Sequence, residues 1–192
     1  MHKELLKATS PITGLSLQWS GFSINEGGYA EICSFVSPLN KDKELNDMFL
    51  SIYNVSLPSP GKIIPYDEGS VFWVSPSQWF ISSKNHNPLF DREIADKFKK
   101  IPIVTMQTDG WISIDLKGSA CLAVLERLVK LNLNDCEFPP GSATRTGCSH
   151  MTIFLQKPNQ ETHFIVLGAR SYAQSLIHAL IQTADNVLGE RK

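Results

Sequence analysis

The order of strand-like and helix-like segments is the feature that most limits the fold of this chain. Residues 70–83 read as two aromatic strands around a Ser-Pro-Ser turn, and an amphipathic helix pattern with Asn87 as its cap follows over 87–100. A short strand pattern covers 101–106, and residues 111–187 then follow the order strand, helix, strand, strand, helix. Helices thus recur after pairs of strands rather than after every strand. This order predicts an α+β fold, with helices packed on one face of antiparallel sheets.

The first 70 residues carry weaker signals. Residues 15–19 alternate apolar and polar side chains, and residues 29–36 read as a strand behind a Gly27-Gly28 turn. Residues 37–67 are rich in proline, and the pattern does not decide whether LNDMFLSIYNV inside them forms a helix or a strand. We expect a single domain over residues 1–192, which could divide into lobes at 1–70 and 71–192.

Composition and charge argue against several classes of protein. Apolar residues make up 42% of the chain and charged residues 19%, which is typical of a globular protein. The net charge of -1 argues against nucleic acid as the main partner, because phosphate binding needs clustered Lys and Arg. No window is long and apolar enough to span a membrane, no signal peptide pattern is present, and the four cysteines form no CxxC pair. We therefore expect a reduced, cytoplasmic protein without a membrane partner.

The densest chemistry lies in residues 144–150, where Arg145, Cys148 and His150 stand among three hydroxyl side chains. If Cys148 and His150 lay on one strand, their side chains would share a face, as a nucleophile and its base must. No third group or protease signature frames the pair, so a core thiol beside a hydrogen-bonded histidine is the favoured interpretation. Arg145 could clamp a carboxylate or a phosphate, but a contact across a subunit boundary or within a loop is favoured.

A zinc site built from Cys136, Cys148 and His150, with His163 as a fourth ligand, is disfavoured. Zinc sites usually bring their ligands together in short C-x2-C knuckles, whereas these two cysteines are twelve residues apart. The GxGxxG and Walker patterns are also absent, which argues against a dinucleotide or ATP site. We thus predict no catalytic, cofactor-binding or metal-binding residue in this chain.

Several aromatic residues occupy positions that look exposed in their strand patterns. Phe154 sits on the polar face of an alternating strand, and Trp111 lies opposite the apolar face formed by its neighbours. Aromatic residues on the outer face of a sheet commonly mark a contact with another protein, but they can equally form a second core layer. Both interpretations stay open for Trp19, Trp73, Trp79, Trp111 and Phe154.

Three segments together resemble the gamma subunit family of heterotetrameric sarcosine oxidase. They are VFWVSPSQWFIS, QTDGWISIDLKGSACLAVLERLVKLNLNDCEFPPGSATRTGCSHMTIFLQK and FIVLGARSYAQSLIHAL, and the resemblance runs from Val71 to about Leu180. The order and spacing of the aromatic hairpin, the strand-Gly-helix unit, the FPPGSATRT segment and the last helix carry it jointly. Ala169 stands where that family usually has a proline. The difference leaves the turn intact, but it weakens an assignment to one particular relative within the family.

The resemblance implies a fold similar to the folate-binding aminomethyltransferase of the glycine cleavage system. It also implies a non-catalytic structural subunit, with FAD, FMN, NAD, tetrahydrofolate and zinc held by partner subunits. That complex demethylates sarcosine oxidatively to glycine and passes the one-carbon unit to tetrahydrofolate, with alpha, beta and delta subunits as partners. Related N-methylglutamate and dimethylglycine dehydrogenases use similar small subunits.

Two further functions remain as alternatives to the structural role. One is a stand-alone folate-binding protein of the aminomethyltransferase type, with Arg145 or Arg170 holding the glutamate tail. The other is a cysteine hydrolase, which would need a reactive Cys148. Under the structural reading, residues 71–82 and 138–150 form the contact surface, with Trp73, Trp79, Trp111, Arg145, His150 and Phe154 as candidate interface residues.

Overall fold

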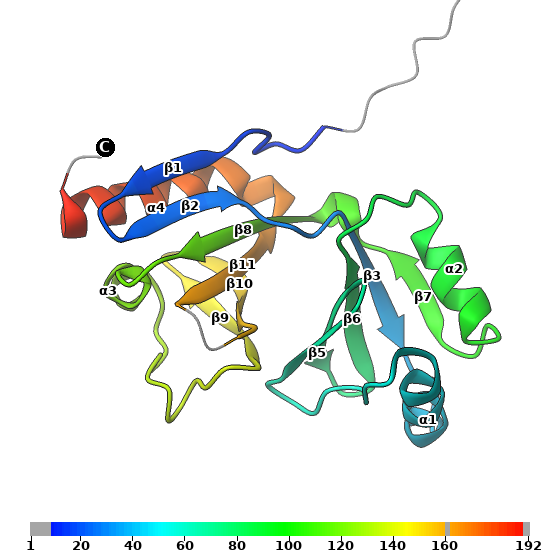
Figure 1. The fold of residues 1–192 in the computed structure, drawn as a ribbon. Coiled ribbons are helices and arrows are strands. Elements are labelled where there is room, and N and C mark those ends of the chain that lie inside the picture. Colours follow the sequence, from blue (N-terminus) through cyan, green and yellow to red (C-terminus); the bar gives the residue numbers. More distant parts are fainter. Residues whose placement is uncertain (1–8, 160–161, 190–192) are drawn as a thin grey trace, which may run out of the picture.

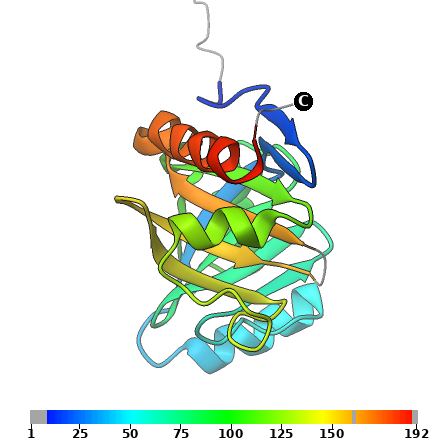
Figure 2. The same cartoon turned by 90° about the vertical axis from the view of Figure 1, so that its left-hand side faces the viewer.

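A six-stranded antiparallel sheet, called sheet 1 here, forms one half of the molecule in the computed structural model, which describes residues 9–159 and 162–189 (Figure 1). Helices α3 (Cys121–Leu128) and α4 (Ala173–Leu188) cover its outer face, as Figure 2 shows. In spatial order its strands are β1 (Ser16–Trp19), β2 (Phe22–Glu26), β8 (Trp111–Lys117), β11 (His163–Ala169), β10 (Met151–Lys157) and β9 (Ser142–Cys148).

Alternation along the strands of sheet 1 explains where its helices pack. Ile112, Ile114 and Leu116 of β8 point to the same face and are buried beneath the helices. Helix α4 meets this face with a stripe of small and aliphatic residues at helical spacing, namely Ala173, Leu176, Leu180 and Ala184. Sheet 1 and helices α3 and α4 therefore enclose a core of mainly aliphatic side chains.

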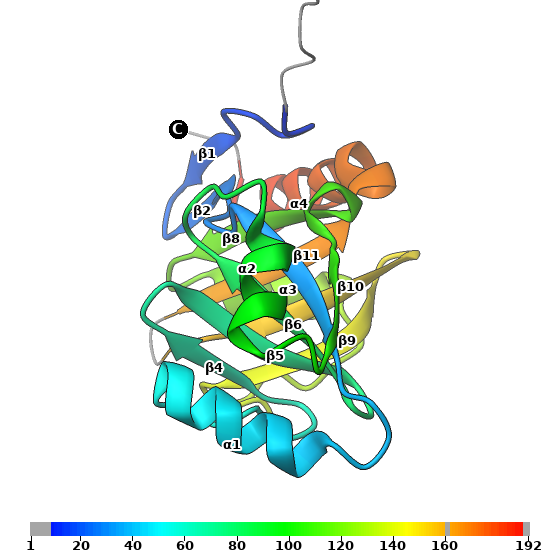
Figure 3. The same cartoon turned by 90° about the vertical axis from the view of Figure 1, so that its right-hand side faces the viewer.

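A five-stranded antiparallel sheet, called sheet 2, forms the other half. Helices α1 (Asp42–Tyr53) and α2 (Phe90–Lys97) lie on its outer face (Figure 3). The core between them is aromatic: the rings of Phe35 and Phe98 meet edge to face with centroids 4.9 Å apart. In spatial order the strands are β4 (Ile63–Tyr66), β5 (Gly69–Ser75), β6 (Gln78–Ser83), β3 (Glu31–Val36) and β7 (Ile103–Met106).

The inner faces of the two sheets pack against each other, so the layers run helices, sheet, sheet, helices. The contact is a third apolar cluster, in which the ring of Phe154 lies 5.5 Å from that of Phe72 and 6.0 Å from that of Phe80. In the sequence, all strands of sheet 2 lie between β2 and β8, although β2 and β8 are neighbours within sheet 1. The two sheets consequently do not divide the chain at residue 70, because β1 and β2 belong with the C-terminal half.

The predicted α+β class, with antiparallel sheets and helices on one face of each, is confirmed. The undecided segment LNDMFLSIYNV is helical up to Tyr53, where helix α1 ends. The predicted cap of the second helix is wrong. Asn87 accepts a hydrogen bond from the Leu89 amide at 2.9 Å and shapes the turn before α2, which begins at Phe90. The predicted aromatic hairpin is β5 and β6, with a bulge between Trp73 and Ser75.

Candidate functional site

Two connections between the sheets cross at the centre of the molecule. Residues 27–30 carry the chain from β2 to β3, and the short 3-10 turn Thr108–Gly110 returns it to β8. The amide of Gly27 donates to the carbonyl of Ser113 at 2.8 Å. A Cβ on Gly27 would lie 2.1 Å from Oγ of Ser113, so only glycine fits at this crossing.

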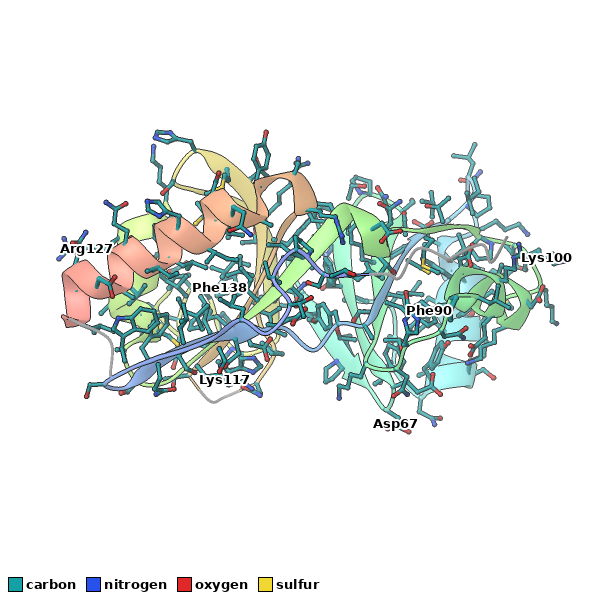
Figure 4. The ribbon with its side chains drawn as sticks, turned by 90° about the horizontal axis from the view of Figure 1, so that it is seen from above. Asp67, Phe90, Lys100, Lys117, Arg127 and Phe138 are labelled. Atoms are coloured by element: carbon teal, nitrogen blue, oxygen red, sulfur yellow. The ribbon has the colours of Figure 1, made fainter. Side chains whose placement is uncertain are left out.

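A cavity of about 580 Å³ opens at this crossing. Its wall consists of residues 9–12, 26–30, 108–109 and 111–113, together with Ile32, Lys84, His86 and Arg170. Figure 4 looks down on the molecule from above, with the half that contains α4 on one side and the half that contains Phe90 and Lys100 on the other. Small-molecule sites favour such junctions between structural units.

The carboxylate of Glu31 lies beside the cavity, and its side chain is only 3% exposed. Oε1 of Glu31 lies 2.6 Å from Nδ1 of His86 and accepts the Asn87 amide at 3.0 Å. Oε2 accepts the hydroxyl of Thr108 at 2.8 Å. Three donors therefore offset the cost of burying this charge. The imidazole of His86 is fixed at Nδ1, while its side chain stays 69% exposed in the cavity wall.

Opposite charges line the rim of the cavity in equal number. Lys84 and Arg170 bring positive charge, and Glu26 and Asp109 bring negative charge. Arg170 is partly engaged, because its Nη2 donates to the carbonyl of Thr9 at 2.6 Å. Glu26 accepts the amide of Gly14 through Oε2 at 3.2 Å. The rim is thus close to neutral, although it carries both signs.

Ser113 presents an unusual hydroxyl in the same wall. The residue is 8% exposed, and its Oγ has no hydrogen-bond partner among the described residues. Buried hydroxyl groups almost always have a partner, since leaving one unpaired costs about 1–3 kcal/mol. The hydroxyl of Ser113 is therefore suited to a polar atom within the cavity.

A polar layer between the sheets continues behind the cavity. Tyr29 donates its hydroxyl to Oε1 of Gln156 at 2.7 Å and accepts the hydroxyl of Ser70 at 2.9 Å. Burial raises the pKa of Tyr29 to about 12, so the phenol stays protonated and keeps donating at neutral pH. This layer holds the two sheets in register beside the cavity.

Among the predicted interface residues, Trp79, Trp111 and Phe154 belong mainly to the interior. Trp79 is 7% exposed and donates its indole N–H to the carbonyl of Pro58 at 2.8 Å. Phe154 is 3% exposed, and its ring lies 5.5 Å from that of Trp111, which is half-buried in the cavity wall. For Trp111 and Phe154 the second core layer is the outcome of the two open interpretations, because sheet 2 covers that face of sheet 1. Trp79 instead packs in the core between sheet 2 and its helices. Trp73 is half-buried against the aromatic core of sheet 2.

Residues 144–150 do not form the single strand that would place Cys148 and His150 on one face. Cys148 ends β9 and pairs with Met151, so His150 lies in the turn between β9 and β10 rather than beside Cys148 on one strand. Burial raises the pKa of the Cys148 thiol to about 11, which opposes the thiolate that a nucleophile needs. Arg145 and His150 are exposed at the hairpin of the edge strand β9. Of the cysteines, Cys136 alone is exposed, and the described residues contain no group of three metal-ligating side chains.

The sequence reasoning missed Glu31, His86 and Thr108. One signal could have pointed to Glu31, since it is the single charge within the apolar run YAEICSFV. A charge inside a buried strand needs partners, so it marks a polar cluster. His86 and Thr108 follow two other strands, and their approach to Glu31 depends on how sheet 2 is assembled.

Comparison with known proteins shows the fold. No family model matches the sequence, and no curated protein matches it either. Among solved structures, the chain is similar to one chain of the heterotetrameric sarcosine oxidase from Corynebacterium sp. U-96, in complex with pyrrole 2-carboxylate. The TM-score is 0.80 at 16% identity, over 96% of this chain and 98% of that chain.

A second solved structure is similar over half of its length. It is the glycine cleavage system aminomethyltransferase T from Bartonella henselae, with a TM-score of 0.58 and 12% identity, covering 88% of this chain and 50% of that one. The α+β architecture of this chain is thus shared with both proteins. Within the described part of the chain, no helix has the length and apolar character needed to cross a membrane.

Proposed function

We propose that this chain is a non-catalytic structural subunit of a sarcosine oxidase complex, equivalent to its gamma subunit. The observation that carries the proposal is the extent of the structural likeness. The chain matches 98% of one chain of that heterotetramer, whereas it spans only 50% of the aminomethyltransferase. A subunit of the same length and architecture, together with the three sequence segments that resemble the gamma family, supports the assignment.

The chemistry of the side chains is consistent with a role in assembly. Burial raises the pKa values of the Cys33 and Cys121 thiols to about 12, and that of Cys148 to about 11, so these thiols are poor nucleophiles. His86 has an orienting carboxylate, but no nucleophile is paired with it among the described residues. In the proposed complex, alpha, beta and delta subunits hold FAD, FMN, NAD, tetrahydrofolate and zinc, and the assembly works in the cytoplasm on sarcosine.

The exposed hairpin of β9 and β10 is the proposed docking surface. It contains Arg145 and His150, which remain at the surface while the aromatic candidates turn inward. Strand β9 is also an edge of sheet 1. Its two ends pair with Lys62 and Val129, so the middle of the edge, around Arg145, is the part that can offer backbone groups to a partner. An exposed arginine on such an edge suits a carboxylate of the partner subunit.

Affinity purification from the native host tests the structural role. The tagged full chain should elute together with flavin absorbance and sarcosine-dependent oxidation. Arg145→Glu should reduce the co-eluting flavin at least about tenfold, since losing an interfacial charge pair can cost more than 1.4 kcal/mol. Arg92→Glu is the matched control, because Arg92 is exposed on α2, which covers the outer face of sheet 2. The proposal fails if the wild-type chain elutes without flavin-containing chains.

A stand-alone folate-binding protein is the second candidate function. The observation that favours it is the cavity at the crossing, with Arg170 in its wall, in a chain that shares architecture with an aminomethyltransferase. Calorimetric titration of the isolated chain with tetrahydrofolate separates the two functions. Saturable binding near a micromolar dissociation constant, about -8 kcal/mol, supports the folate-binding protein. The structural subunit predicts no saturation in that range.

A further inference from the structure

The charge pattern of the cavity restricts what it can bind. Lys84 and Arg170 would attract an anion, but Glu26 and Asp109 on the same rim would repel a ligand with two negative charges. A neutral apolar molecule would make no use of the four charges on the rim. A zwitterion places a carboxylate near the two cations and an ammonium group near the two carboxylates, so it satisfies both signs at once.

The wall of the cavity also has an apolar part. It is formed by Ile32, which is 3% exposed, and by the half-buried ring of Trp111, and both belong to the apolar cluster between the two sheets. Such a surface favours an aliphatic or aromatic group of the ligand. The volume of about 580 Å³ leaves ample room for one large side chain and its charged backbone groups.

Two polar side chains of the wall, those of His86 and Ser113, can hydrogen-bond directly to a ligand. Glu31 fixes His86 through Nδ1, which leaves Nε2 on the far side of the ring as the atom that can contact a ligand. Ser113 adds a buried hydroxyl without a partner among the described residues. A preorganised imidazole and an unpaired hydroxyl are what a small polar ligand requires for orientation.

From these observations we propose that the cavity binds a free α-amino acid with a large apolar side chain. The carboxylate lies toward Lys84 and Arg170, and the ammonium group lies toward Glu26 and Asp109. The apolar side chain packs on Ile32 and Trp111, and His86 and Ser113 complete the polar contacts. This site is independent of the proposed structural role, since it lies at the crossing and not on the β9–β10 hairpin.

Titration of the full chain tests the site, with L-phenylalanine as the probe and calorimetry as the readout. Two analogues remove one charge each: L-phenylalanine amide lacks the carboxylate, and 3-phenylpropionate lacks the amine. We expect saturable binding of L-phenylalanine, and binding at least about tenfold weaker for each analogue. Because the charged groups on the rim are exposed, affinity should also fall when salt is added.

A variant that fills the cavity localises the binding. A Cβ on Gly28 meets nothing within 4 Å, so Gly28→Leu should leave the fold intact while its side chain occupies the cavity mouth. Gly147→Leu is the matched control, because a Cβ there also meets nothing within 4 Å and the residue lies on β9. We expect Gly28→Leu to abolish binding and Gly147→Leu to preserve it, with thermal unfolding confirming that both variants fold.

Ser113→Ala and His86→Gln probe the two hydrogen-bonding groups, and each should weaken binding several-fold. The proposal is overturned if L-phenylalanine shows no saturable binding up to about 10 mM. It is also overturned if Gly28→Leu binds as well as the wild type, or if either analogue binds as tightly as the amino acid. Titration of the isolated chain does not require the complex, so these results are distinguishable from a failure of the structural assignment.

Discussion

A Cβ built on Gly168 would lie 2.6 Å from Cδ2 of Leu176. Gly168 belongs to β11 and Leu176 to the fully buried stripe of α4, so the glycine sets how closely this helix approaches sheet 1. The contact involves the end of a side chain that is itself packed on all sides, which leaves it little freedom to move.

Gly168→Val should therefore destabilise the fold. Overpacking of a tight core typically costs about 1–3 kcal/mol, and we expect a loss in that range from urea unfolding. Gly147→Val is the control, since the added side chain meets open space on β9. Equal stability of the two variants would contradict the packing described here.

Phe154→Ala should be among the most damaging substitutions. The ring contacts those of Phe72, Phe80 and Trp111 between the two sheets, and removing a buried phenylalanine side chain costs about 3–5 kcal/mol. Phe154→Leu keeps most of the volume and should lose clearly less. If Phe154→Ala kept full stability and lost only partner binding, Phe154 would be an interface residue rather than a core residue.

Alkylation should distinguish the cysteines. At neutral pH an alkylating reagent should modify Cys136 rapidly in the folded chain, because it alone among the cysteines is exposed. Cys148 should react only after unfolding, since burial both shields it and raises its pKa to about 11. Mass spectrometry of the time course reads this out, with Cys136→Ser as the control. Rapid labelling of Cys148 in the native chain would instead favour the cysteine hydrolase as the function.

The same thiols predict how stability depends on pH. Below the ordinary thiol pKa of 9.0 they are protonated in both states, so they cause no change. Above pH 9 the unfolded chain loses these protons, whereas the folded chain holds them until the pKa values of about 11 for Cys148 and about 12 for Cys33 and Cys121. The free energy of unfolding should then fall by at most about 1.4 kcal/mol per pH unit and thiol.

Urea unfolding under reducing conditions between pH 8 and pH 11, roughly the span over which free thiols ionise, measures this effect. Cys148→Ala should show a shallower decline than the wild type, because one of the titrating thiols is gone. A wild-type stability that stays flat across this range would contradict the burial of the thiols.

How much the sequence predicts depends on how local the signal is. The alternation in β8, the Ser-Pro-Ser turn and the stripe of α4 act over a few residues, so these elements and the fold class are predictable. Phe154 and Trp111 lie on the second face of their strands, and alternation does not reveal whether that face meets water or another sheet. Here sheet 2 covers it, and this long-range contact decides in favour of the core layer.

The cavity lies beyond the reach of such patterns. Its wall combines the N-terminal segment, the two crossings, the segment after β6 and the start of the turn before α4. Glu31, His86 and Thr108 become neighbours only when sheet 2 has formed and the crossings have closed. Sequence patterns of period 2 or 3.6 carry no information about such a meeting.

The most direct test of the structural role compares the isolated chain with the complex that it is proposed to join. Sarcosine-dependent oxidation and visible flavin absorbance are measured for both at equal chain concentration. The account predicts a colourless, inactive isolated chain and a yellow, active co-purified assembly. A purified chain that carries its own flavin, or oxidises sarcosine unaided, would contradict it.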